Sequence, residues 1–144
     1  MTAIKPLNIS FEVPGVPVAM QRNRHARAGD KLINYQPEKT GNFRALCGFC
    51  ASNAYKGTPS ENLINCSINF IFPAPKSLKK SQRELIENDK CLPWRVNKDI
   101  DNLIKSVLDS VQGIIMRNDN QVVEIYACKL IGKTPKTVIQ FTEL

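Results

Sequence analysis

The stretch Ile64-Asn65-Cys66-Ser67-Ile68-Asn69-Phe70-Ile71-Phe72 carries the clearest strand pattern in the chain. Apolar side chains alternate with polar ones as far as Phe70, which is the period of a strand that is buried on one face. Pro73 and Pro75 follow, and proline predicts the end of a strand because it cannot donate to the ladder. We therefore expect a strand from residue 64 to residue 72.

Weaker patterns on both sides of this strand predict the other elements. They indicate a strand at 7–13, an irregular hairpin at 20–35 that turns at Gly29, a helix at 41–55 capped by Thr40, a short helix at 77–88, a loop at 91–98, a helix at 101–112, and strands at 121–131 and 136–141 that pair antiparallel with each other. This order predicts a single α+β domain over residues 1–144, with a mixed or antiparallel sheet and helices packed on one face.

Composition narrows the class of protein. The chain has 144 residues, which is the size of one domain, and it has no apolar run long enough to span a membrane. The N-terminus has no apolar stretch after its first basic residue, and the five cysteines are an odd number. We therefore expect a cytoplasmic protein without a disulfide framework. The net charge of +7 favours a polyanionic partner, and nucleic acid is the commonest one.

The densest chemistry lies around Asp99 and Asp101, where a predicted loop enters a predicted helix. Two converging carboxylates repel each other unless a cation lies between them, and Mg²⁺ takes one or two protein carboxylates together with water. Lys105 follows Asp101 by one helical turn and can neutralise a phosphate there. Asp119 precedes a predicted strand, and it can complete the metal cluster if that strand packs beside the helix.

Each of these residues also has a purely structural interpretation. Asp101 can be an ordinary helix N-cap, with Lys105 as its i+4 partner. Asp119 and Asn120 are residues that any turn uses. Residue spacing therefore leaves the metal site and the structural roles open.

Two motifs resemble the RusA family of Holliday junction resolvases. Residues 98–105, Lys-Asp-Ile-Asp-Asn-Leu-Ile-Lys, match its D-x-D-N-L-x-K pattern, and residues 118–122, Asn-Asp-Asn-Gln-Val, match its D-D-x-Q-[VI] pattern, with Asn118 in place of the first acid. Residues 11–18 and 21–24 are similar to the family's opening strand and its basic start, and residues 35–40 to its Y-x-P-x-x-T entry into the first helix.

The resemblance implies a specific activity and site. It implies a homodimeric α+β endonuclease, often of phage or prophage type, that resolves four-way DNA junctions during recombination and repair by paired nicks, using Mg²⁺ or Mn²⁺. The acids Asp99, Asp101 and Asp119 match the family's metal ligands, and Lys105 matches its catalytic lysine. Two identical cuts related by a two-fold axis require two identical active sites, which accounts for the dimer.

Basic residues supply candidate contacts to the DNA backbone. The candidates are Arg22, Arg24, Arg27, Lys31 and Lys98. The first four belong to the predicted hairpin, which can equally be a solvated surface feature.

Two other functions stay open at this point. The chain can be a branched-DNA-binding protein of the same fold with weak or no cleavage. It can also be a cytosolic dithiol protein that uses Cys47 and Cys50, although a C-x-x-C pair inside a helix is more often two small buried residues.

Overall fold

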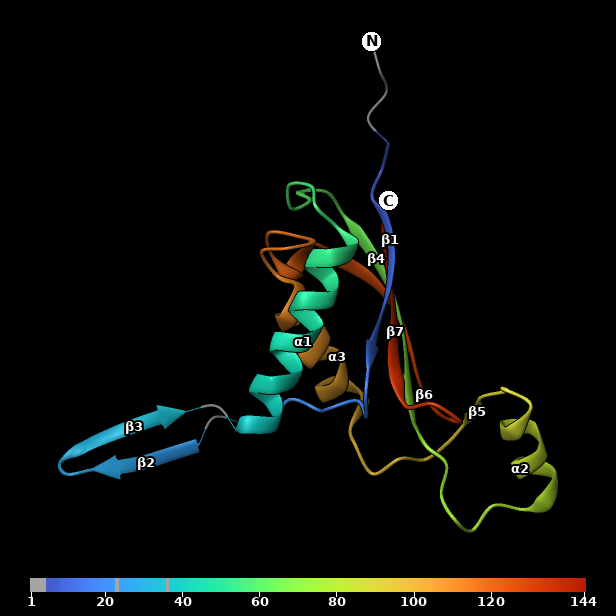
Figure 1. Cartoon of the computed structure of the whole chain (residues 1–144). Helices are drawn as coiled ribbons and strands as arrows, with labels where there is room; N and C mark the ends of the chain where they lie inside the picture. Colours follow the sequence, from blue (N-terminus) through green and yellow to red (C-terminus); the bar gives the residue numbers. More distant parts are fainter. Residues whose placement is uncertain (1–4, 23, 36) are drawn as a thin grey trace.

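Figure 1 shows the computed structural model, which describes residues 5–22, 24–35 and 37–144. The elements follow the chain as β1 (Asn8–Pro14), β2 (Arg24–Ala28), β3 (Lys31–Tyr35), α1 (Glu38–Ala54), β4 (Ile64–Pro73), α2 (Lys80–Glu87), β5 (Leu92–Pro93), α3 (Ile100–Val111), the 3-10 turn η1 (Asp119–Gln121), β6 (Val122–Gly132) and β7 (Lys136–Glu143). The expected α+β fold is confirmed. No helix in these described ranges is long and apolar enough to cross a membrane.

The main sheet has five strands in the order β1-β7-β4-β6-β5. Strand β4, the one with the clearest sequence pattern, lies at its centre. It runs parallel to β6 on one side and antiparallel to β7 on the other. The mixed sheet is therefore confirmed.

The predicted antiparallel pairing of the last two strands is wrong, because β4 lies between β6 and β7. Pro73 ends β4 at the level of Gly132, the last residue of β6. Since proline has no N–H to extend the ladder, the chain can turn past the end of β4. It then returns on the far side, where Lys136 pairs with Ile71.

Helices α1 and α3 cover one face of the sheet (Figure 1). In β4 the side chains of Cys66, Ile68 and Phe70 point into this layer and are fully buried. Helix α3 contributes Leu103, Val107 and Val111, which are also fully buried and recur at helical spacing. The expectation of helices on one face is thus confirmed.

Helix α1 begins earlier than the sequence predicted. Pro37 is its N-cap and Glu38 its first residue, while Thr40 lies buried inside the first turn instead of capping it. Proline suits a helix start because that position needs no N–H donor, and an acid in the first turn favours the helix dipole. Farther along α1, a Cβ on Gly48 would lie 3.3 Å from the Ser110 carbonyl oxygen, so glycine permits the close approach to α3.

The buried position of Ile68 predicts that truncating its side chain destabilises the protein. Ile68→Ala should lower the free energy of unfolding by about 2–5 kcal/mol, because the side chain is removed from a packed site. The measurement is the urea midpoint of unfolding, with Leu85→Ala as control, since Leu85 on α2 is 45% exposed. The control should change stability by less than about 0.5 kcal/mol. A loss for Ile68→Ala as small as the control's would contradict this core.

Candidate active site

The start of α3 carries two carboxylates for which the described residues provide no capping hydrogen bond and no ion pair. Asp99 is the N-cap residue in an extended conformation, and its carbonyl accepts the N–H of Leu103 at 3.1 Å. Its carboxylate makes no capping hydrogen bond with any described residue. Asp101 lies in the first turn and is exposed, and neither acid forms an ion pair within the described ranges. Both carboxylates are therefore available to a ligand.

Three anchors hold this end of α3 in place. The buried face of the helix packs on the sheet. The Met20 N–H donates to the Asn102 carbonyl at 2.9 Å. The Lys129 ammonium on β6 donates to the carbonyls of Val96 and Lys98 at 3.0 and 2.8 Å. Sequence reasoning missed Lys129, because no local pattern marks a strand lysine that binds a loop more than thirty residues away.

Lys105 is exposed one turn after Asp101. Its ammonium forms no ion pair with a residue of the described part of the chain. The interpretation of Lys105 as a mere partner of Asp101 thus has no ion pair to support it.

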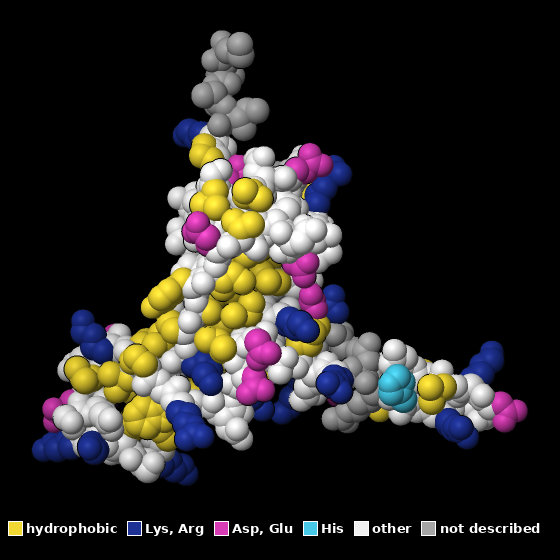
Figure 2. Space-filling view, turned by 180° about the vertical axis from the view of Figure 1, so that it is seen from behind, with side chains coloured by type: hydrophobic (Ala, Val, Ile, Leu, Met, Phe, Trp, Pro, Cys, Tyr) yellow, Lys and Arg dark blue, Asp and Glu magenta, His cyan; other side chains and the backbone are white. Residues whose placement is uncertain are grey.

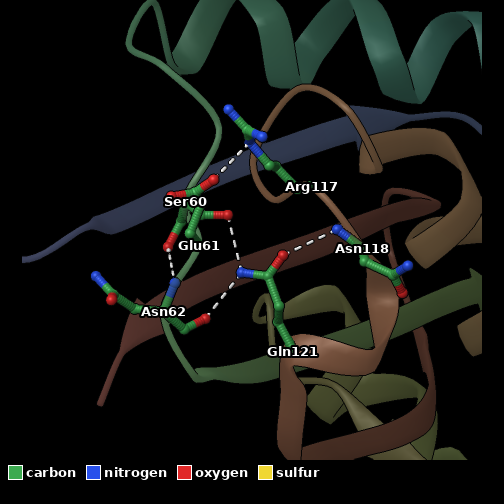
Figure 3. Close-up of polar contacts among 6 residues, drawn as sticks. All are labelled: Ser60, Glu61, Asn62, Arg117, Asn118 and Gln121. Atoms are coloured by element: carbon green, nitrogen blue, oxygen red, sulfur yellow. Dashed lines mark hydrogen bonds and ion pairs between the residues drawn. The ribbon is translucent and has the colours of Figure 1, made fainter.

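Gln121 fixes the segment that carries Asp119 (Figure 3). Its side-chain amide donates to the carbonyls of Ser60 and Asn62 at 2.8 and 2.9 Å, and its oxygen accepts the Asn118 N–H at 2.9 Å. The side-chain oxygen of Asn118 accepts the Asn120 N–H at 2.9 Å. These contacts hold η1 firmly and leave Asp119 itself exposed.

The two acidic positions lie at opposite ends of β6. Asp119 comes directly before the strand, whereas Lys129, near its end, binds the loop that leads into Asp99. The seven steps from Val122 to Lys129 span about 23 Å. In the described part of the chain, no three His, Cys, Asp or Glu side chains are grouped to hold a metal ion. One chain thus does not bring Asp119 together with Asp99 and Asp101.

The residues at the start of α3 nevertheless suit a divalent cation. Mg²⁺ is commonly bound by one or two carboxylates together with water and substrate phosphates. The free oxygens of Asp99 and Asp101 match that set.

The outer edge of β6 is open. Over the described residues, β5 pairs with β6 at Leu130 and Ile131, and the Trp94 N–H donates to the Lys129 carbonyl at 3.2 Å, so only the edge from Val122 to Cys128 has no neighbouring strand. The side chains of Val123, Ile125 and Tyr126 are 52%, 45% and 66% exposed. Figure 2 shows hydrophobic side chains gathered across the middle of the face seen from behind. An unpaired apolar edge of this kind is normally covered in a native protein.

The β2–β3 hairpin extends away from the sheet and helices (Figure 1). Arg22 precedes it, and Arg27 and Lys31 lie on it, all exposed. The Arg24 side chain lies outside the described residues. Lys98 is exposed beside Asp99, far along the chain from the hairpin.

Burial makes the cysteine pair unsuited to thiol chemistry. It raises the pKa of Cys47 to about 12 and also raises the pKa of Cys50. A nucleophilic dithiol needs a thiolate near neutral pH, so a raised pKa works against it. Cys47, on α1, is instead part of the hydrophobic core.

Comparison with known proteins adds to this geometry. The family model for endodeoxyribonuclease RusA matches residues 14–142. A protein of Bacillus subtilis (strain 168) that bears the name uncharacterized protein YqaN is 28% identical over 137 residues, which cover 94% of this chain and 96% of YqaN. Because the family match spans nearly the whole chain and includes the acids at the start of α3, the chain belongs to the RusA family of endodeoxyribonucleases.

Proposed function

We propose that residues 1–144 form one metal-dependent endonuclease domain that cuts four-way DNA junctions by paired nicks. The observation that carries this proposal is that, among the residues the structure describes, neither carboxylate at the start of α3 nor Lys105 one turn later forms an ion pair. Family membership supplies the reaction class.

The chain's own residues would share the work of phosphodiester cleavage. Asp99 and Asp101 would hold Mg²⁺, or Mn²⁺ in its place, which when bound supplies a hydroxide nucleophile and stabilises the leaving oxygen. Lys105 would offset the charge of the phosphate under attack. Arg22, Arg24, Arg27, Lys31 and Lys98 would contact the DNA backbone, which makes binding strongly dependent on salt.

A homodimer would bring the third acid to the other two. If the open edges of two β6 strands pair antiparallel about a two-fold axis at Ile125, Gln121 of one protomer lies opposite Lys129 of the other. Lys129 binds the carbonyl of Lys98, next to Asp99. Asp119 of the second protomer would therefore stand near Asp99 and Asp101 of the first. We propose that each active site is shared in this way.

A branched-DNA-binding protein without cleavage is the second candidate. The observation that favours it is the absence of a three-acid group in the described part of a single chain. Binding of junctions without cleavage in either metal would identify it.

The first prediction concerns Asp101→Asn. Loss of a metal-binding carboxylate should lower the rate of junction cleavage about 100-fold or more. Binding should stay equal or become tighter, because a negative charge near phosphate is removed. The assay follows nicking of a synthetic four-way junction and a matched linear duplex, in Mg²⁺ and in EDTA.

Glu87→Gln provides the matched control, since it removes the same charge from exposed α2. It should cut at the parental rate. If Asp101→Asn also cuts like the parent, the proposed metal site is excluded.

The second prediction tests the shared site by mixing two inactive variants. Asp101→Asn and Asp119→Asn should each be inactive alone, but a mixed dimer keeps one intact site, made from Asp101 of one protomer and Asp119 of the other. After subunit exchange, at most about a quarter of the sites are intact, so single-strand nicks should return without paired cuts.

Subunit exchange itself is verified by native mass spectrometry with one variant carrying a mass label. Mixing two preparations of Asp101→Asn serves as the negative control and should restore nothing. An inactive mixture in which exchange is complete would show that the acids of one site come from one protomer.

A further inference from the structure

A pocket of about 670 Å³ opens beside the start of α3. Its walls come from the segment between β1 and the hairpin, from the first half of α1, and from the loop that leads into α3. Asp99 lines it, and the Met20–Asn102 hydrogen bond ties two of its walls together. Sites for small organic groups fall in a range of about 300–1,000 Å³, so the pocket is large enough for one nucleotide.

The lining combines amides with an apolar surface. Four amide side chains border the pocket, namely Gln21, Asn42, Asn97 and Asn102. Each presents a donor and an acceptor together, which is the pattern that base edges also present. Val18, Phe43 and Leu46 provide apolar contact for the flat face of a ring.

The pocket is lined by two basic residues and one acid, a combination that suits a nucleotide. Lys39 and Lys98 line it, are exposed and can face a phosphate, while Asp99 connects it to the proposed metal site. A nucleotide in the pocket would therefore lie close to the phosphate at the proposed metal site.

We propose that this pocket receives one unpaired nucleobase of the strand being cut. The inference rests on the proposed nuclease function and extends it by naming the part of the DNA that is recognised. Extruding a base costs a few kcal/mol in an intact duplex and least where the base is already unpaired. The continuous base stack is interrupted at a branch point, so a base there would be extruded at lower cost than in an intact duplex, and the pocket would couple cleavage to branched structure and to base identity.

The experiment is a cycle that combines one protein change with one DNA change. Leu46→Trp fills the pocket from α1, where Leu46 is 38% exposed. The DNA change replaces, one position at a time, each nucleotide flanking the cut by an abasic nucleotide. At one position, each change alone should slow cleavage about 10-fold or more, as the loss of a bound base does.

The two changes together should be no slower than either alone, because both remove the same contact. Phe49→Trp is the control: it adds the same ring to α1, at a residue that is 64% exposed and does not line the pocket. It should cut intact and abasic junctions as the parent does. Rates that multiply in the double change, or no sensitivity to the abasic nucleotide at any position, would overturn the proposal.

Asn42→Ala covers the case in which tryptophan disturbs the fold. Asn42 is exposed on α1, so its urea midpoint should stay parental while the relative rates on A, C, G and T at the sensitive position change. Unchanged relative rates would argue against base recognition here. A parent protein that cuts no junction in Mg²⁺ or Mn²⁺ would instead refute the nuclease function, and the base pocket with it.

Discussion

Parallel strands cannot be joined by a tight turn, so the pairing of β4 with β6 forces the chain to return across the sheet before β6 begins. Helix α3 makes the last part of that return. Its first turn lies beside the end of β6, held by Lys129, and its last turn leads to the loop from which β6 starts. The acids at the start of α3 and the acid that follows the helix are therefore separated by the length of the strand. This single constraint explains why a motif continuous in sequence is divided in space.

The same crossover connects the open edge of β6 with the assembly of the proposed active site. An edge with exposed Val123, Ile125 and Tyr126 is a liability unless another chain covers it. A two-fold axis reverses the direction of the second strand, and reversal is the operation needed to bring the beginning of one β6 to the end of the other. In the proposed dimer, covering the edge and assembling the three acids are one event, so folding, association and activity would depend on the same strand.

Local sequence patterns were sufficient to predict the helices and strands, but they were insufficient to predict which strands pair with each other. The alternation in residues 64–72 predicted β4, and the helix predicted at 101–112 corresponds to α3. The order of strands depends on contacts between distant segments, so β6 and β7 were wrongly paired, and Thr40 was wrongly made a cap because a buried threonine and a capping one look alike in sequence. The acids of the candidate site were recognisable as residue types, whereas their separation follows from the crossover, which no local pattern reveals.

The β2–β3 hairpin carries proposed DNA contacts that lie away from the active site. A two-stranded ribbon is marginal in water by itself, and its apolar residues Leu32, Ile33 and Tyr35 are exposed together with the basic ones. The register places Arg27 beside Leu32 on one face and Ala26 beside Ile33 on the other. In the proposed complex, phosphate contacts to the basic residues would supply the stability that the ribbon lacks. The ribbon would then be more stable in the protein bound to DNA than in the free protein.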